Sequence, residues 1–583
     1  MRFLLLILSV SIFSCERDDV DRVERKAPSL VDLVESVETD KSRYNPGEEV
    51  RITLRLKSLE FDSVRVSYRH LSEIVDQQLL PAGETLVELL WNPPPDDFKG
   101  YGVEFRFILQ GDIVDYASTA VDVSSDWTRF PRYGFLSKFL EMSGASIDRV
   151  LDKLKSYHIN GLQFYDWHHK HHRPLPIENG DPLPSWKDIA RREISFSIVE
   201  KYIAGAKERN IASMSYNLLY GAWEGYQQDG VQSDWMIYND PNQTIVNKHD
   251  LDDNWAISDI YVANPANAGW QEYIFNSTAT IYQHLDFDGW HLDQLGHRGD
   301  VYDYSGSPVD LWNTFPPFLN NLKNEFPEKT MALNAVNQYG QLEILTTPVN
   351  FAYTEVWPPN ESFDDLVQII QDNYRWNRLT KTVLAAYVNY DLADSPGEFN
   401  DPAVLLTDAV IMAFGGAHIE LGEHMLGKEY FPNNNLRMSR DLQQRLIEYY
   451  DFMVAYQNVL RDEGQLSLST GITSNEINIS DWNQKAGSVG TFSRNFIDRK
   501  VYHLLNFQGV SSMQWRDNDG TQTSPEKSEN FKIILPIEEV SKISYASPDW
   551  LDGVQQNLDF RQTSTGYEVT IPYLEYWGML IVE

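Results

Sequence analysis

Residues 286–296 read DFDGWHLDQLG, and residues 351–357 read FAYTEVW. Both stretches are typical of short β-strands, in which successive side chains point to opposite faces. The strand-like part of each stretch leads to a carboxylate, Asp293 in the first and Glu355 in the second, and each carboxylate has aromatic neighbours. The sequence therefore predicts two acids that project from strand ends into one aromatic-lined space.

Strand-like runs of this kind recur between about Phe130 and Arg461 and alternate with segments of helical apolar spacing. The predicted strands are Tyr133 to Phe135, Gly161 to Tyr165, Ala212 to Asn217, Phe287 to Leu292, Met331 to Ala335, Phe351 to Glu355, Val383 to Val388 and Ala409 to Ile419. The predicted helices include Ile147 to Tyr157, Ser195 to Arg209, Ala268 to His284 and Ser362 to Arg375. Eight strands over roughly 330 residues fit a (β/α)8 TIM barrel, whose active site collects at the carboxyl ends of the strands.

The segments on either side of this region have the alternation and turn residues of antiparallel sheets. We predict an immunoglobulin-like β-sandwich at residues 41–125, the (β/α)8 catalytic barrel at 126–464 and a C-terminal β-sandwich at 465–583. The expected fold class is thus a multidomain α/β plus β chain with a central barrel.

The first residues resemble an export signal. Arg2 precedes an apolar run from Phe3 to Phe13, which is too short to span a bilayer as a helix. Cys15, the single cysteine, follows this run in an arrangement that resembles a bacterial lipobox. We therefore expect a lipoprotein signal at residues 1–15, a lipidated Cys15, a charged tether at 16–40 and a location in the cell envelope, with a membrane contact only through the lipid. A plain signal peptide with an incidental cysteine is the alternative.

The composition of the chain limits the class of ligand that it can bind. The 583-residue chain has a formal net charge of -36, so a nucleic acid backbone would repel it. Aromatic residues make up 13% of the chain, with 16 Trp and 31 Tyr, and such rings suit stacking on the apolar faces of sugars. A neutral polymer is the favoured ligand, and we expect a monomer that needs no cofactor.

Paired carboxylates at strand ends indicate cleavage of an acetal, because one acid protonates the leaving oxygen and another captures the sugar carbon. Asp293 is the predicted nucleophile, kept ionised by donors such as His291 or Gln294. Glu355 is the predicted acid/base, because burial against rings raises a carboxyl pKa. The distance between the two carboxyls decides between retention and inversion, and the sequence leaves that distance open.

Three motifs resemble one known family, glycoside hydrolase family 66, the dextranases and cycloisomaltooligosaccharide glucanotransferases. They are Phe287 to Trp290 leading to Asp293, Tyr353 to Trp357, and Phe164 to Trp167 followed by His171. The resemblance implies a retaining double displacement on α-1,6-glucan (dextran) that yields isomaltooligosaccharides, with Asp293 as nucleophile and Glu355 as acid/base. It also implies flanking β-domains. His291 and Leu292 depart from the smaller or more polar residues expected there, which makes fine specificity less defined.

Further residues are predicted to bind substrate. They are Tyr165, Asp166, His171, Asn217, Trp290, Asn334, Tyr353, Trp357 and Asn389, with Tyr220, Trp223 and Asn337 as weaker candidates. The cluster of four histidines at residues 168–172 lacks the spacing of a zinc site, so we expect a loop that binds sugar hydroxyls and no metal.

Later, His418, Glu420, Glu423 and His424 either line the site or form a structural network. Asp250 to Trp255 begins like a calcium loop, but Trp255 stands where the turn needs Gly.

Two alternatives to hydrolysis of dextran stay open. A transferase would use the same intermediate and pass the glycosyl group to a sugar hydroxyl, but family members of that kind typically carry an inserted carbohydrate-binding module. The longest predicted loop, between Tyr216 and Ala268, is too short for one. A surface glycan-binding lipoprotein with a degenerate barrel would bind without turnover, and the presence of both acids disfavours it.

Overall fold

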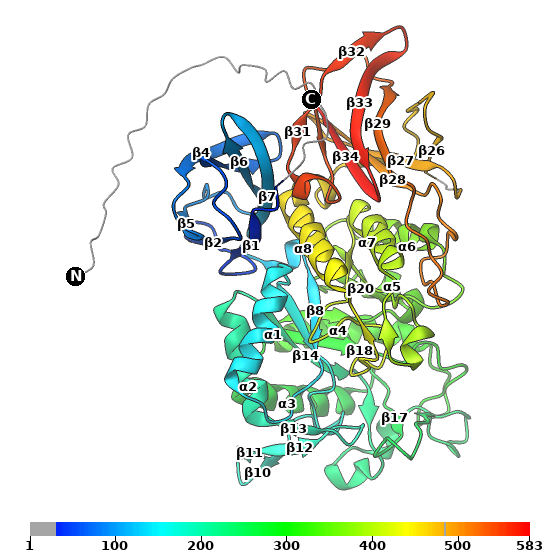
Figure 1. Cartoon of the computed structure of the whole chain (residues 1–583). Coiled ribbons are helices and arrows are strands. Elements are labelled where there is room, and N and C mark those ends of the chain that lie inside the picture. Colours follow the sequence, from blue (N-terminus) through cyan, green and yellow to red (C-terminus); the bar gives the residue numbers. More distant parts are fainter. Residues whose placement is uncertain (1–30, 483–484) are drawn as a thin grey trace, which may run out of the picture.

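The computed structural model describes residues 31–482 and 485–583 (Figure 1). The predictions for residues 1–15, with the lipidation of Cys15, and for the tether up to residue 30 lie outside the described residues. Within the described ranges, every helix is too short or too polar to cross a bilayer.

The N-terminal part consists of two antiparallel sheets that pack against each other. One sheet has the order β1-β2-β5 and the other β4-β3-β6-β7. Tyr68 of β3 stacks on Trp91 of β5, with ring centroids 4.4 Å apart, so the two sheets share one core. The strands are β1 (Val34–Thr39), β2 (Val50–Leu56), β3 (Ser63–His70), β4 (Glu73–Pro81), β5 (Leu86–Trp91), β6 (Lys99–Leu109) and β7 (Asp112–Val123).

The predicted tether at 16–40 is wrong in its last residues, because Val34–Thr39 form β1 and pair with β2. Glu35 and Glu38 hide the strand pattern in the sequence. Val34 and Val37 nevertheless pack against the core of the N-terminal part.

The middle of the chain forms two parallel sheets. The first has the order β19-β18-β14-β9-β8 and the second β20-β21-β23. A parallel bridge between Asn334 and Tyr353 links β19 to β20. β8 and β23 are the remaining edge strands of the two sheets. They are linked by the Phe135 amide of β8, which donates to the Leu421 carbonyl just after β23 (3.0 Å). The strands are β8 (Tyr133–Leu136), β9 (Gly161–Phe164), β14 (Ala212–Leu218), β18 (Gly289–Asp293), β19 (Thr330–Leu333), β20 (Ala352–Glu355), β21 (Thr382–Ala385) and β23 (Ala417–His418).

Helices lie around these sheets, and short strands occur in the loops between them (Figure 1). The helices are α1 (Gly144–Ser156), α2 (Phe196–Glu208), α3 (Ala268–His284), α4 (Phe315–Glu325), α5 (Gln341–Ile344), α6 (Phe363–Trp376), α7 (Asp401–Ala413), α8 (Arg440–Ala455) and α9 (Gln457–Leu460). The loop strands are β10 (Ile177–Glu178), β11 (Asp181–Pro182), β12 (Ser185–Lys187), β13 (Glu193–Ser195), β15 (Gly221–Ala222), β16 (Lys248–His249), β17 (Ile260–Val262), β22 (Gly397–Glu398) and β24 (Leu436–Arg437).

The predicted strand from Ala409 to Ile419 is wrong over most of its length. Residues up to Ala413 belong to α7, and the strand β23 is only Ala417–His418. Every residue of α7 from Ala403 to Ala413 is buried, so the helix is apolar all round and has no polar face. The periodicity of a short, continuous apolar run does not distinguish a buried helix from a buried strand.

The C-terminal part again consists of antiparallel sheets, with one parallel pair between β26 and β27. It packs against the end of α7, where Phe414 stacks on Phe492 with ring centroids 3.9 Å apart. The strands are β25 (Gln465–Ser467), β26 (Ile479–Asp481), β27 (Val489–Asn495), β28 (Lys500–Asn506), β29 (Ser528–Leu535), β30 (Ile543–Ala546), β31 (Gln556–Asn557), β32 (Phe560–Thr563), β33 (Gly566–Leu574) and β34 (Trp577–Val582).

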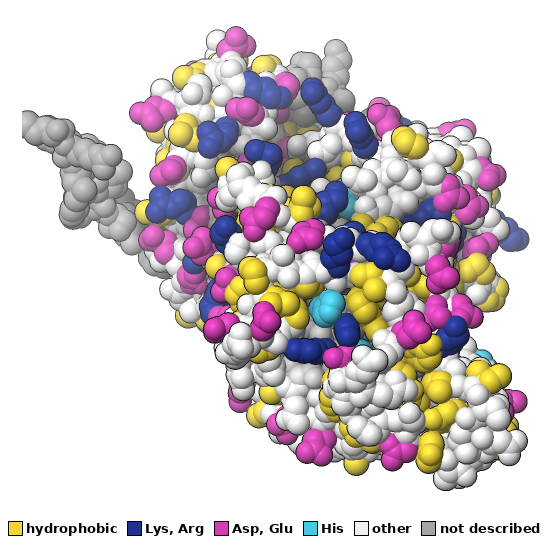
Figure 2. All heavy atoms as spheres, turned by 90° about the horizontal axis from the view of Figure 1, so that it is seen from below, with side chains coloured by type: hydrophobic (Ala, Val, Ile, Leu, Met, Phe, Trp, Pro, Cys, Tyr) yellow, Lys and Arg dark blue, Asp and Glu magenta, His cyan; other side chains and the backbone are white. Residues whose placement is uncertain are grey.

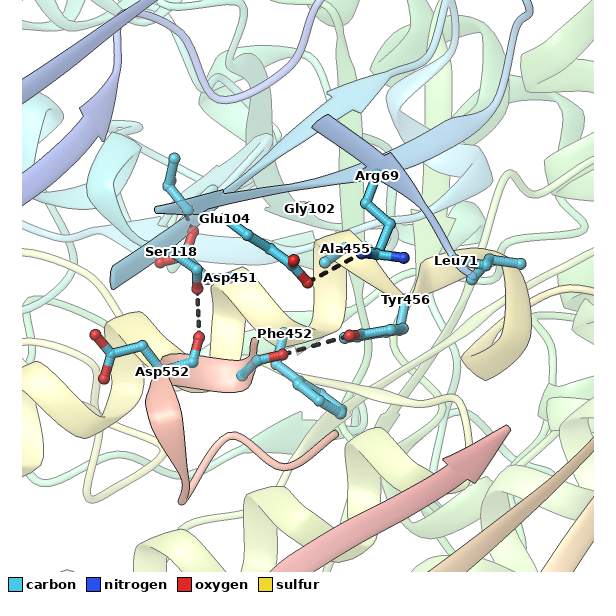
Figure 3. Close-up of a pocket in the computed structure, with 12 residues that line it drawn as sticks. Arg69, Leu71, Gly102, Glu104, Ser118, Asp451, Phe452, Ala455, Tyr456 and Asp552 are labelled. Atoms are coloured by element: carbon cyan, nitrogen blue, oxygen red, sulfur yellow. Dashed lines mark hydrogen bonds and ion pairs between the residues drawn. The ribbon is translucent and has the colours of Figure 1, made fainter. Parts of the chain in front are cut away.

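The three parts meet beside α8 at a small cavity of about 20 Å³ (Figure 3). Arg69 and Glu104 come from the N-terminal part, Tyr456 follows α8, and Asp552 comes from the C-terminal part. The Ser118 hydroxyl donates to the Asp552 carbonyl across this junction. A cavity of this volume has room for about one water molecule and none for a sugar. The junction therefore fixes the parts to one another and is not a substrate site.

A buried ion pair ties the N-terminal part to the first parallel strand. Arg132 lies 2.7 Å from Asp122, and the two side chains are 1% and 0% exposed. We expect Arg132→Leu to destabilise the protein by about 3–5 kcal/mol, because the substitution leaves a buried carboxylate without its cation. Thermal unfolding would measure the loss as a lower melting temperature. Arg51→Leu is the matched control, since Arg51 and Glu88 are 47% and 57% exposed and such pairs contribute about 0–1 kcal/mol. Equal shifts for the two variants would contradict this expectation.

Candidate active site

The two predicted acids stand at the carboxyl ends of β18 and β20, and Asn334 lies between them at the end of β19. The Asn334 side-chain amide donates to Asp293 Oδ1 at 2.9 Å and to Glu355 Oε2 at 3.1 Å. Because both bonds share one nitrogen atom, the two carboxylate oxygens lie within about 6 Å of each other. The structure thus brings Asp293 and Glu355 together as a pair.

Asp293 accepts three hydrogen bonds. Besides Asn334, the Tyr216 hydroxyl donates to Oδ2 at 2.7 Å, and the Gln294 backbone amide donates to Oδ1 at 2.8 Å. Burial raises the pKa of Asp293, whereas these three donors act to lower it by stabilising the carboxylate. The expected donor His291 has another partner, because its Nδ1 lies 3.2 Å from the Tyr133 hydroxyl.

The pKa of Glu355 lies well above that of an ordinary carboxyl. Burial and the neighbouring negative charge of Asp293 raise the pKa of Glu355 to about 7. The Tyr387 hydroxyl donates to Oε1 at 2.7 Å and opposes part of this rise. A carboxyl with such a pKa can give up and regain a proton near neutral pH, as a general acid/base requires.

Aromatic rings form the walls beside the pair. Tyr165 is stacked between Tyr216 and Phe431, with centroid distances of 5.1 and 4.4 Å. Tyr353 is 2% exposed and packs edge-on to His291 at 4.6 Å. Trp357 is half-buried and its ring centroid lies 5.5 Å from that of Tyr387.

A third carboxylate, Asp166, lies just beyond the end of β9. Its backbone has a φ of 50°, and its Oδ2 lies 3.6 Å from Arg192 Nη2. Asp188 pairs with the same guanidinium nitrogen at 2.5 Å. Burial raises the pKa of Asp166 to about 7, with the negative charges of Asp188 and Asp293 acting in the same direction. Asp166 is therefore near enough to Asp293 for their charges to interact.

Two further predicted residues, His171 and Asn217, hold the histidine loop at residues 168–172 in place. The Trp223 indole donates to His171 Nδ1 at 2.7 Å, and the Asn217 amide donates to the His171 carbonyl at 2.7 Å. Burial lowers the pKa of His171 to about 3, so this ring is neutral at pH 7. His171 is thus a neutral imidazole that packs within this loop.

Two predicted substrate-binding residues are wrong. Trp290 points to the opposite face of β18 from Asp293, where it is 2% exposed and packs against Phe318 of α4. The Asn389 amide donates to the Asp517 carbonyl at 2.7 Å, and its oxygen accepts from the Asn400 amide at 2.8 Å. Neither side chain has a group left for a sugar.

His418 and Glu420 form a structural network with Asp408. His418 Nδ1 lies 2.8 Å from Asp408, its Nε2 lies 2.7 Å from the Ala386 carbonyl, and Tyr450 donates to Glu420 at 3.2 Å. Among the described residues, these three groups could hold a metal, since their ligand atoms lie within 4.8 Å of one another. All three are buried.

The other two late candidates support loops beside the aromatic wall. Glu423 accepts from the backbone amides of Ser137 and Lys138, and His424 Nε2 lies 2.8 Å from the Phe431 carbonyl. Both residues therefore stabilise the surroundings of the pair without a direct bond to it.

Sequence reasoning missed Tyr216, Tyr387 and Arg192. Tyr216 and Tyr387 stand near the carboxyl ends of predicted strands, so their positions in these strands could have identified both as residues of the site. Arg192 lies in the loop before β13, and its sequence position gives no sign of its contact with Asp166.

The sequence profile of Glycosyl hydrolase family 66 matches residues 39–581. The chain belongs to this family. It is therefore a glycoside hydrolase, and the predicted family is confirmed. The matched range spans nearly all of the described residues.

Individual relatives agree with the family assignment. Two cycloisomaltooligosaccharide glucanotransferases of Niallia circulans are each 27% identical, over 94% and 100% of this chain and 72% and 75% of their own length. A dextranase of Streptococcus salivarius is 22% identical over 81% of this chain and 66% of its own length. A crystal structure of a Paenibacillus sp. cycloisomaltooligosaccharide glucanotransferase with cycloisomaltoheptaose superposes with a TM-score of 0.87, at 26% identity over 94% of this chain and 99% of that one. These findings confirm a multidomain α/β plus β fold.

Proposed function

We propose that this family 66 member is an endo-acting, retaining glycoside hydrolase that cleaves the α-1,6 linkages of dextran to isomaltooligosaccharides. The observation that carries this proposal is the single Asn334 amide that bonds both Asp293 and Glu355. The dextranase and glucanotransferase relatives support the choice of an α-1,6-glucan as substrate.

In the first step, Asp293 attacks the anomeric carbon while Glu355 donates its proton to the leaving glycosidic oxygen. The bond to the leaving sugar breaks, and a covalent glycosyl ester forms on Asp293. In the second step, Glu355 takes a proton from water, which attacks the same carbon and releases Asp293 as a carboxylate. Asn334 positions both acids, and Tyr216 stabilises the charge that Asp293 carries before and after the ester.

The spacing of the acids favours retention. Retaining enzymes have carboxyl groups about 5–5.5 Å apart, whereas inverting enzymes need about 6.5–9.5 Å to fit a water molecule. The shared Asn334 nitrogen limits the nearest oxygens to about 6 Å. This limit leaves little room for a water between a base carboxylate and the anomeric carbon.

Hydrolysis is favoured over cyclisation. The alignment with the second glucanotransferase extends over 743 positions, so about 160 of them have no counterpart in the 583 residues of this chain. An inserted module of the kind expected in cyclising enzymes is of that order of size. Chromatography of the products from dextran tests the choice: we expect linear isomaltooligosaccharides, and cyclic products as the main fraction would overturn it.

We also propose the finer architecture. The eight parallel strands and their two edge links support a (β/α)8 barrel at 126–464, and the paired sheets on either side support an immunoglobulin-like β-sandwich at 41–125 and a second sandwich at 465–583. We propose a monomer that a lipid on Cys15 holds at the cell envelope. Cys15→Ala is then expected to release the protein from the membrane fraction, and continued sedimentation would contradict the anchor.

A further inference from the structure

Trp255 is the one exposed tryptophan among the 16 of this chain, all of which the structure describes. Its exposed fraction is 40%. Exposing an aromatic side chain of this size to water costs free energy, which contact with a ligand would recover. Ile245, Ile257 and Tyr304 are further exposed apolar side chains on the loops that follow β14 and β18.

The backbone around Trp255 is firmly held. The amides of Trp255 and Ala256 both donate to the Asp252 carbonyl, at 3.1 and 2.9 Å. Arg191 donates to the Ala256 carbonyl at 2.7 Å, and the Ile257 amide donates to the Ile189 carbonyl at 2.8 Å. The indole is therefore presented on a fixed turn, which lowers the entropic cost of binding a ligand.

A short chain of contacts leads from Trp255 to the acids. Its ring lies 5.8 Å from that of Tyr430, which is half-buried. The Arg192 guanidinium lies 5.8 Å from the same Tyr430 ring and 3.6 Å from Asp166. Phe431, the next residue, is in the aromatic stack beside Asp293. Trp255 and Tyr430 thus extend the aromatic wall outward from the cleavage site.

One face of the molecule has a hollow near its centre (Figure 2). Figure 2 views the molecule from below, the side on which β10 to β13 and β17 lie in Figure 1. Hydrophobic side chains, a histidine and several Lys or Arg side chains gather around a hollow near the centre of this face. Asp and Glu are spread more widely over it.

We propose that Trp255 and Tyr430 form a glucosyl-binding subsite distant from the point of cleavage, where a pyranose ring of the dextran chain stacks on the indole. The inference rests on the proposed function and adds to it a dependence on chain length. A substrate that reaches the subsite gains one more aromatic contact, and a substrate that ends at the cleavage site does not. A contact that changes kcat/KM 5- to 10-fold contributes about 1–1.4 kcal/mol.

The test compares kcat/KM for dextran with kcat/KM for isomaltotetraose. We expect Trp255→Ala to lower the ratio of the two about 5- to 10-fold, mainly through KM for dextran. Trp255→Phe should retain most of the ratio, because the ring is kept. Tyr374→Ala is the matched control, since Tyr374 is a half-buried tyrosine on the outer helix α6. This control should leave the ratio unchanged.

The outcomes separate the two proposals. If the parent cleaves dextran and Trp255→Ala leaves the ratio unchanged, or if Tyr374→Ala lowers it equally, the subsite is overturned and the proposed function stands. If the parent cleaves neither substrate, the proposed function itself fails and the subsite fails with it.

Discussion

Asp293→Asn is expected to lower kcat on dextran by about 10⁴-fold or more, because the amide cannot attack the anomeric carbon or leave as a carboxylate. The replacement is nearly isosteric, and residues that form a covalent intermediate carry effects of this order. A reducing-sugar assay under saturating dextran measures the loss.

The control for this variant is Asp286→Asn. Asp286 lies in the same stretch, but it is 67% exposed and pairs with Lys207 on the surface. Its replacement should change kcat less than about twofold, in keeping with the small effects of surface substitutions. Activity of Asp293→Asn within tenfold of the parent, with unchanged thermal unfolding, would remove Asp293 from the catalytic role.

Glu355→Gln is expected to lower kcat/KM on dextran by about 10²- to 10⁴-fold, the usual contribution of a general acid/base. An aryl α-glucoside with a good leaving group should lose much less, because its departure needs no proton. The parent's rate should fall as pH rises through about 7, since Glu355, with its pKa of about 7, then loses the proton that it must donate. The Gln variant should lack this alkaline fall. Rates over pH 5 to 9 on both substrates measure these effects.

One result would reassign the acid. If Glu355→Gln kept the parent's fall above pH 7, another group would have to titrate there. Asp166 is that group, because burial raises its pKa to about 7 as well. Asp166→Asn would then be expected to remove the alkaline fall.

Strand positions in the middle of the chain were predictable because short buried strands alternate with amphipathic helices. β20 lies within its predicted strand and β18 extends one residue beyond the predicted end at Leu292, and each strand ends at the predicted acid. The prediction failed at α7, where burial on all sides removes the helical period, and at β1, where two glutamates interrupt the apolar pattern. In both places tertiary packing, not local sequence, decides the structure.

For the site, strand ends indicated where the acids stand, but not which partners they have. Asn334 was predicted as a sugar ligand, and the structure shows it as the bridge between Asp293 and Glu355. Trp290 misled because aromatic character next to an acid does not reveal on which face of the strand the ring lies. Contacts between distant loops, such as Arg192 with Asp166, have no local signal at all.

The most direct test of the account is to trap the glycosyl-enzyme intermediate. A fluorinated glucosyl donor that forms the ester but hydrolyses slowly would be incubated with the enzyme, and the labelled peptide would be sequenced by mass spectrometry. The account predicts one sugar per chain, attached to Asp293 in the peptide that contains residues 286–296. A label on another carboxylate, or turnover of the donor with inversion and no label, would contradict it.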